Sequence, residues 1–434
     1  MSESWFKQIR EFGPLIILLS VLFGPLSVLN IAGRTPNLFW CDLLLLFFAG
    51  IELAILIQQH GQPIFKPYPF INFFFIYLVL ASASLVWTAD FLSSLAILKL
   101  RVVPLIAFAY IVAWGRSFNA EKHLPPWIVV TVGLLGLQII WNLYSSTSST
   151  LSIQELGEDV FSTKDLARTG IGKSNYLASI LILVFPLNMF ITKRSKGFLF
   201  TLLNIASLGL ALFALMITQS RGAVICLLLG IIIGSLIYIL GATHAERWAF
   251  VRWSLIYVLS GTMVVVLLWS WMPEDVQAEY MRTIEFLMDQ WQQGNIAGNR
   301  EDIWRAGMRH VFDSPILGIG LGNQQSMKQA LEMSESTHNL YLDTFLELGV
   351  SGFIVLMGLF IGLMNNIYKG YFNATNADSK YLKLSVLSGM IIAMINAFQE
   401  PSFWAAQYGI VLWFLLGLGC LSMNQGKFYE VPFG

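Results

Sequence analysis

The stretch STHNLYLDTFLELGVSG, residues 336–352, brings polar side chains into a chain made largely of apolar segments. A histidine and an asparagine open it, two carboxylates follow, and two glycines lead into another apolar run. If residues 338–348 form a helix, Asp343 and Glu347 share one face, because residues four apart are neighbours on a helix. Gly349 then permits a bend or close packing where the chain enters the apolar run.

The composition is that of a membrane protein. Hydrophobic residues make up 56% of the 434 residues and charged residues only 12%, against about 25% charged residues in soluble domains. A membrane-spanning helix needs about 20 apolar residues. Twelve stretches come close to this requirement: 14–31, 38–57, 69–87, 91–114, 124–144, 175–192, 198–218, 222–241, 251–272, 349–368, 381–398 and 406–422. The sequence therefore predicts an all-α integral membrane protein with about twelve transmembrane helices.

Lysine and arginine indicate the orientation, because cytoplasmic loops carry an excess of both. If the N-terminus is inside, the cytoplasmic segments contain Lys7, Arg10, Lys66, Arg116, Lys122, Lys193, Arg194, Lys196, Arg247, Arg252, Lys369, Lys380, Lys383 and Lys427. The short outer loops contain only Arg34 and Arg221. Both termini are therefore predicted to be cytoplasmic.

Two long segments then lie on the outer side, at about 145–174 and 273–348. The predicted organisation is transmembrane helices 1–9 in residues 1–272, one large helical outer loop in 273–348, and helices 10–12 in 349–434. Residues 273–337 contain ten acidic and five basic residues, a net charge of −5. Such a surface disfavours nucleic acid or another polyanion as a partner, so any anion site in the loop must be local.

GNREDIWRAGMRHVFDSPILGIGLGN, residues 298–323, contains a local cluster of this kind. The spacing predicts a helix with acidic residues in its first turn, on which Arg305 and Arg309 share a face. Trp304 and Met308 form a neighbouring stripe on the same helix. The glycines that follow allow the backbone to approach another segment closely. The alternative is a solvated helix on which the arginines pair with nearby acids.

Further cations lie at the outer ends of predicted spans. Arg221 sits between two apolar runs, at the membrane–water boundary, where its planar guanidinium matches the oxygens of a phosphate. Arg168 and Lys173 precede the span at 175–192, with glycines between them. Cations and glycines beside a helix N-terminus favour an anion site. The alternative for all three is an interfacial anchor that reaches lipid phosphates.

Lys99 and Arg101 lie near the middle of the span at 91–114. Charges inside spans are costly, so they are usually paired or functional. Positions two apart point about 200° away from each other on a regular helix, so these two cannot face one cavity. Glu52 in the second span is a candidate partner.

His338 is the candidate catalytic residue of the opening stretch. A histidine near neutral pH is a natural proton acceptor for a sugar or alcohol hydroxyl. Asn339 can orient it or bind substrate. The alternative is a structural histidine bonded to loop backbone, because one titratable group does not make a site. Several arginines at the same membrane face, however, suit chemistry on a lipid-linked phosphate. No pair of histidines has metal-ligand spacing.

These features together resemble the bacterial O-antigen ligase family, which is related to O-antigen polymerases and protein O-oligosaccharyltransferases. The ligase signature is His, then Asn, Ser or Gln, then nine residues and Gly-x-x-Gly. Here it reads His338-Asn339, nine residues from 340 to 348, and Gly349-Val350-Ser351-Gly352. SRGA at 220–223 and NREDIWRAG with SPILGIGLGN resemble the family's outer arginines and glycine segment. The resemblance covers roughly residues 168–400.

The resemblance implies that the chain transfers a glycan from undecaprenyl diphosphate to the lipid A–core of lipopolysaccharide. The transfer would occur at the periplasmic face of the bacterial inner membrane, within membrane lipid and without a metal or another cofactor. His338 would be the base that activates the acceptor hydroxyl. Arg221 and Arg300 would contact the diphosphate, with Arg305 and Arg168 as further substrate contacts.

Other functions compatible with these residues remain open. A polymerase of O-antigen or exopolysaccharide shares much of the signature but extends a growing lipid-linked glycan. A protein O-oligosaccharyltransferase is disfavoured, because the chain ends about a dozen residues after the last predicted span. A twelve-span transporter belongs to a different class, and it is disfavoured because no internal repeat or pair of interrupted helices is evident.

Overall fold

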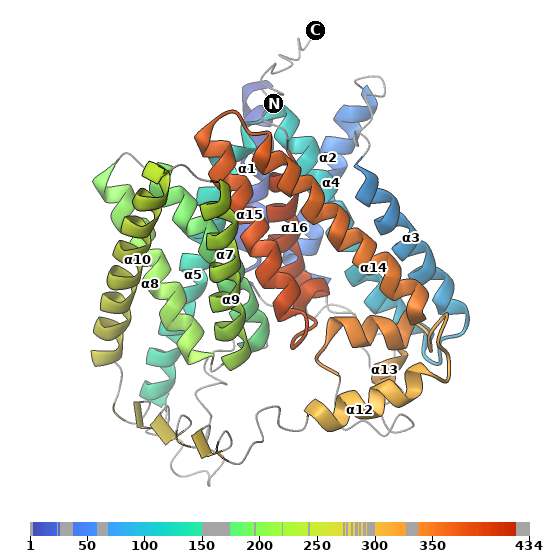
Figure 1. Ribbon diagram of the computed structural model, residues 1–434. Coiled ribbons are helices and arrows are strands. Elements are labelled where there is room, and N and C mark those ends of the chain that lie inside the picture. The colour runs from blue at the N-terminus through green and yellow to red at the C-terminus, as the bar shows by residue number, and fades with distance from the viewer. Residues whose placement is uncertain are drawn as a thin grey trace.

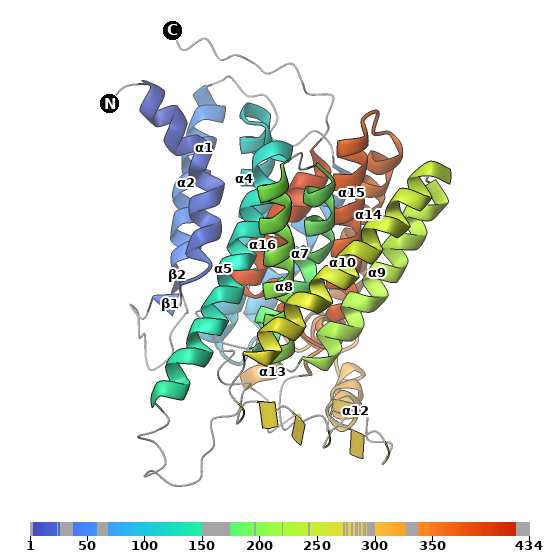
Figure 2. The same cartoon turned by 90° about the vertical axis from the view of Figure 1, so that its left-hand side faces the viewer.

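The structure is a computed structural model in which most of the chain forms a bundle of helices (Figures 1 and 2). It describes residues 3–23, 25–26, 38–58, 68–149, 174–194, 197–218, 220–241, 244–271, 300–326 and 337–421, with scattered positions between 274 and 292. Within these residues the chain is mostly helical, which confirms the predicted class. Strands β1 (Pro25–Leu26) and β2 (Leu38–Phe39) form a short antiparallel pair.

The helices have the following bounds. The first group is α1 (Glu3–Ser20), α2 (Trp40–Gln58), α3 (Pro69–Ala83), the 3-10 helix η1 (Ser84–Val86), α4 (Phe91–Ser117) and α5 (Ala120–Ser149). The second group is α7 (Ser174–Arg194), α8 (Phe198–Ile217), α9 (Arg221–Gly241) and α10 (His244–Ser270). The third group is α12 (Arg300–Val311), α13 (Asn323–Ser326), α14 (Leu340–Phe372), α15 (Ala377–Asn396), the 3-10 helix η3 (Ser402–Trp404) and α16 (Ala406–Cys420).

Each predicted span overlaps one of the long helices. Among the described residues, six helices are long and apolar enough to cross a membrane: Trp40–Gln58, Pro69–Val86, Phe91–Ser117, Ala120–Asn142, Arg221–Leu240 and Leu340–Phe372. Three shorter apolar helices are Ser174–Asn188, Thr201–Ile217 and Ala406–Cys420. The chain is therefore a multi-pass membrane protein, and the count of twelve spans stays a prediction.

The first predicted span, 14–31, differs most from the structure. The corresponding helix, α1, begins at Glu3 and ends at Ser20. Pro25 lies instead in the paired strand β1. A proline lacks the N–H that a helix requires and disfavours helical geometry in the residue before it, which accounts for the earlier end.

Helix α16 forms the centre of the bundle. All its residues from Ala406 to Cys420 are buried, as expected for a helix that is apolar on every side. It packs against α4, α7, α14 and α15, while α14 also packs along α3 and α15 along α7 and α9. The N-terminal end of α14, which follows His338 in the chain, lies beside α12 and α13 (Figure 1).

Helix α14 is broken at Gly349. This glycine has φ 66° and ψ −166°, so a short first half, residues 340–348, is followed by a longer second half, residues 350–372. The predicted helix over 338–348 is correct from Leu340 onward and wrong for the two residues before it. The bend predicted at Gly349 is confirmed.

The glycine-rich segment 315–322 packs against this break. Four backbone hydrogen bonds join the two: Ile319 N to Leu346 O (2.8 Å), Gly320 N to Glu347 O (2.9 Å), Val350 N to Pro315 O (2.8 Å) and Ser351 N to Ile316 O (3.4 Å). The first two satisfy carbonyls at the end of one half-helix, and the third satisfies an N–H group at the start of the next. A Cβ added to Gly318 or Gly349 would clash with the opposing backbone, which confirms the close approach predicted for the glycines.

Buried ion pairs connect the helices of the N-terminal half. Arg10 forms a bidentate pair with Glu52, at 2.7 and 2.8 Å, so the expectation that Glu52 pairs with a charge of α4 is wrong. Lys99 pairs with Asp42 of α2 at 2.6 Å. Arg101 points elsewhere, as the 200° separation on a regular helix requires.

Candidate active site

His338 lies directly before α14, at the end of the bundle that carries α12 and α13 (Figure 1). Its φ of 50° is positive, which is uncommon for a residue other than glycine. Asn339 caps α14: its side-chain oxygen accepts hydrogen bonds from the N–H groups of Tyr341, at 3.0 Å, and Leu342, at 3.2 Å. Since Asn339 is the N-cap, His338 lies just outside the helix. Unusual backbone geometry of this kind concentrates at functional sites.

Glu400 faces the histidine from the loop between α15 and η3. Its Oε2 lies 3.5 Å from Nδ1 of His338, and it also accepts a 3.0 Å hydrogen bond from the side chain of Asn175 in α7. The Glu400 side chain is 5% exposed and that of His338 is 21% exposed. A buried carboxylate beside Nδ1 orients an imidazole ring.

Thr337 holds the backbone on the other side of the histidine. Its hydroxyl is hydrogen-bonded to the carboxylate of Asp343 in α14, and its carbonyl accepts a 2.7 Å hydrogen bond from the indole N–H of Trp304 in α12. Thr337 is fully buried. The position of His338 is therefore determined by α12 and α14 together.

Glu347 anchors the glycine-rich segment behind the histidine. Its Oε1 accepts a 3.0 Å hydrogen bond from the N–H of Gly322, and its Oε2 lies 3.8 Å from Arg101 of α4. The guanidinium of Arg101 also stacks over the ring of Trp404, 4.8 Å from its centre. On this one face of the first half of α14, Asp343 thus bonds to Thr337 and Glu347 pairs with Arg101.

Two of the predicted arginines interact electrostatically. Arg221 is the first residue of α9 and is exposed, and Arg300 is the first residue of α12 and is half-buried. Although 78 residues separate them in the sequence, the charge of Arg300 acts on the guanidinium of Arg221. Two guanidinium groups at helix N-termini whose charges act on each other favour an anion.

The other predicted contacts are placed differently. Arg305 forms a 2.6 Å ion pair with Glu301, one turn earlier on α12, and both side chains are about 70% exposed (70% and 68%). This is the alternative anticipated for a solvated helix. Arg168 lies outside the described residues. In the described part of the chain, no three His, Cys, Asp or Glu side chains gather as metal ligands would.

One known protein family matches part of the chain. Residues 206–357 match the family described as O-antigen ligase. The chain carries an O-antigen ligase family domain. No curated protein matches the chain. The family predicted from the signature is therefore confirmed, and the matched residues include Arg221, Arg300, Arg305, His338 and Asn339.

Residues on both sides of the O-antigen ligase domain complete the site. Glu400, Asn175 and Arg101 all lie outside residues 206–357, and sequence reasoning assigned them no role in the site. The available signal for Glu400 was weak: a single acidic residue before a proline, between two apolar runs. Arg101 was noted as a charge within a span, but its partner was not evident.

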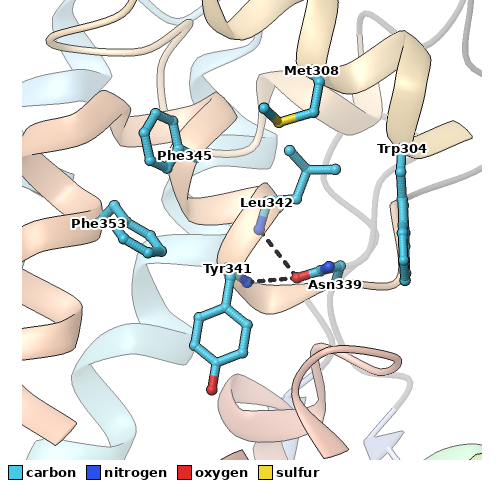
Figure 3. Close-up of a pocket in the computed structure, with 7 residues that line it drawn as sticks. All are labelled: Trp304, Met308, Asn339, Tyr341, Leu342, Phe345 and Phe353. Carbon is cyan, nitrogen blue, oxygen red and sulfur yellow. Dashed lines mark hydrogen bonds between the residues drawn. The ribbon is translucent and has the colours of Figure 1, made fainter. Parts of the chain in front are cut away.

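An apolar pocket of about 260 Å³ lies beside the capped end of α14. It is lined by Trp304, Met308, Asn339, Tyr341, Leu342, Phe345 and Phe353. Figure 3 shows Trp304 on one side, with Phe345 and Phe353 on the opposite side. The pocket therefore joins α12 to both halves of α14, next to the histidine of the O-antigen ligase domain.

Proposed function

We propose that this protein is an O-antigen ligase, which transfers a glycan from undecaprenyl diphosphate to the lipid A–core of lipopolysaccharide. One observation carries the proposal. Within an O-antigen ligase domain, a histidine backed by a buried carboxylate lies at the same end of the bundle as two arginines whose charges act on each other. This arrangement combines a base with an anion site, the two requirements of transfer from a lipid diphosphate.

The reaction assigns one role to each group. His338 accepts the proton of an acceptor hydroxyl, and the oxygen then forms a bond to the anomeric carbon of the glycan. The bond from that carbon to the diphosphate oxygen breaks, and undecaprenyl diphosphate leaves with the electron pair. Arg221 and Arg300 stabilise the charge that develops on this leaving group. Glu400 stabilises the imidazolium that His338 becomes.

The membrane orientation follows from the positive charges. Arg116, Lys122, Arg247, Lys369 and Lys380 lie at helix ends away from α12, and the positive-inside rule assigns that side to the cytoplasm. The candidate site then faces the periplasm, in a protein of about twelve spans in the inner membrane with both termini inside. Arg168 and Arg305 are proposed as further contacts to the lipid-linked glycan.

A polymerase of O-antigen or exopolysaccharide is the second candidate, because the same family includes enzymes that use another acceptor. The hydroxyl would then belong to a growing lipid-linked glycan, and the roles of the histidine and arginines would be unchanged. The acceptor is therefore the property that the experiment must identify.

The test uses purified protein, lipid-linked O-glycan and rough lipopolysaccharide in EDTA. We expect glycan to appear on the lipopolysaccharide with wild-type protein and not with His338→Ala. His310→Ala is the matched control, because His310 lies on α12 and pairs with Asp313 rather than with the site. Thermal unfolding of each variant separates loss of the base from loss of the fold.

Each outcome is decisive. Longer lipid-linked glycan with unmodified lipopolysaccharide would establish a polymerase and overturn the ligase. Wild-type transfer by His338→Ala would remove the proposed base, and loss of transfer on addition of EDTA alone would contradict a metal-independent reaction.

A further inference from the structure

The pocket beside α14 presents mostly hydrocarbon surface, because its lining side chains are mostly apolar and the polar groups of Trp304 and Tyr341 have partners. The indole N–H of Trp304 donates to the carbonyl of Thr337, and the hydroxyl of Tyr341 donates to the carbonyl of Met394 at 2.8 Å. The oxygen of Asn339 accepts the two cap bonds of α14. Among the described residues, none that lines the pocket is charged. A sugar ring or a phosphate would find few partners here, whereas hydrocarbon would be well matched.

The size of the pocket limits the occupant. Its volume is about 260 Å³, whereas a cavity of about 150 Å³ in another protein holds one benzene molecule. An isoprene unit has five carbons, one fewer than benzene. The pocket therefore accommodates roughly one to two isoprene units, a small part of a long lipid chain.

The helix that forms one wall also carries the anion site. Arg300, Trp304 and Met308 are four residues apart on α12, so they follow one another along one face. With a rise of about 1.5 Å per residue, Arg300 and Trp304 are separated by only about 6 Å along the helix axis. A ligand bound here has its phosphate and its first hydrocarbon group about one helical turn apart.

That spacing distinguishes between lipids. In a polyprenyl diphosphate the first isoprene unit is bonded directly to a phosphate oxygen. In a phospholipid or in lipid A, ester groups and a glycerol or sugar separate the phosphate from the hydrocarbon. An apolar pocket one turn from the arginines therefore fits the isoprenyl diphosphate.

We propose that the pocket between α12 and α14 binds the isoprene units nearest the diphosphate of the donor. The inference rests on the proposed function, since it takes the diphosphate at Arg221 and Arg300. It adds a specificity-determining site, in which Trp304, Met308 and Phe345 select a donor with an isoprenoid lipid. This selection is independent of recognition of the glycan.

Measurements of ligand affinity, in the absence of glycan transfer, test this site. The full-length protein in phosphatidylcholine nanodiscs is titrated with farnesyl diphosphate, inorganic diphosphate and lysophosphatidic acid, and calorimetry gives each affinity. We expect farnesyl diphosphate to bind at least about tenfold more tightly than inorganic diphosphate, because burying each CH₂ group contributes about 0.8 kcal/mol. Lysophosphatidic acid should lack this advantage.

Met308→Trp is the variant that fills the pocket. Met308 is 46% exposed, so a larger side chain is tolerated without repacking a core. We expect it to lower the affinity for farnesyl diphosphate to that for inorganic diphosphate and to leave the latter unchanged. Met263→Trp on α10 is the matched control, because Met263 is 65% exposed and lies outside the pocket lining.

The outcomes separate this proposal from the proposed function. Equal affinity of the wild type and Met308→Trp for farnesyl diphosphate would contradict isoprene binding in this pocket. Absence of measurable farnesyl diphosphate binding to the wild type would contradict it as well. An equal gain for lysophosphatidic acid would assign the pocket to acyl chains instead. A protein that shows the expected binding but transfers no glycan would retain the pocket and refute the ligase.

Discussion

Arg101 in the middle of α4 forms an ion pair with Glu347 at the end of the first half of α14, with 3.8 Å between Nη2 and Oε2. Both side chains are under 10% exposed, at 9% and 6%. The pair joins a membrane-spanning helix to the segment that packs behind the candidate active site, because Glu347 also accepts the N–H of Gly322. A charge far away in the sequence thus contacts the half-helix that His338 precedes.

Removing one partner of this pair should lower the stability of the fold more than removing both. Arg101→Met leaves a buried carboxylate without its cation, which costs about 3–5 kcal/mol, whereas the double variant with Glu347→Gln buries no unpaired charge. We expect the single variant to unfold at a clearly lower temperature in detergent and the double variant to recover part of the loss. Glu301→Gln is the control, because the exposed pair with Arg305 contributes under about 1 kcal/mol. Equal unfolding temperatures for Arg101→Met and Glu301→Gln would show that the buried pair is unimportant.

Gly349→Ala should disrupt the break in α14. A side chain there would clash with the carbonyl of Ile316, and the φ of 66° adds strain for any residue with a Cβ, of the order of 1–3 kcal/mol. We expect lower yield of folded protein and at least tenfold less glycan transfer. Gly50→Ala in α2 serves as the control, because nothing lies within 4 Å of the added Cβ. Normal transfer and stability in Gly349→Ala would mean that the break does not position the site.

Glu400→Gln should lower activity while leaving the fold intact. The amide keeps the size of the carboxylate but not its charge, so it stabilises the imidazolium of His338 less well. We expect at least about tenfold slower transfer, mainly in kcat, with an unchanged unfolding temperature. Asn175→Ala, which removes the other partner of Glu400, should produce a smaller loss of the same kind. An effect confined to KM would show that Glu400 contacts substrate instead.

Substitutions of Arg305 and Glu301 test whether Arg305 contacts the substrate or only forms its surface ion pair with Glu301. An exposed ion pair is weak enough for the arginine to exchange Glu301 for a substrate. If Arg305 contacts the donor, Arg305→Ala should raise KM several-fold while Glu301→Ala leaves it unchanged. We expect this difference, measured with lipid-linked glycan as the varied substrate. Identical kinetics for both variants and wild type would leave Arg305 with only its surface ion pair.

The sequence alone determined the class of the protein, because apolar stretches of membrane-spanning length are a local property. It also identified the helix that begins at Arg300 and the bend at Gly349, since acidic residues in a first turn and glycines act within a few residues. The ligase signature from His338 to Gly352 is likewise local, and it sufficed to predict the family. The division into segments at 272 and 348 stays a prediction.

Only the tertiary structure decided which charges meet. Glu400 follows His338 in the chain only after two complete helices, α14 and α15, yet lies beside it. Arg101 pairs with Glu347 rather than with Glu52, because helix packing sets these distances. The left-handed backbone of His338 also depends on contacts from α12, through Trp304 and Thr337. Ion pairs and buried hydrogen bonds act over a few ångströms of space, and sequence separation gives no measure of that distance.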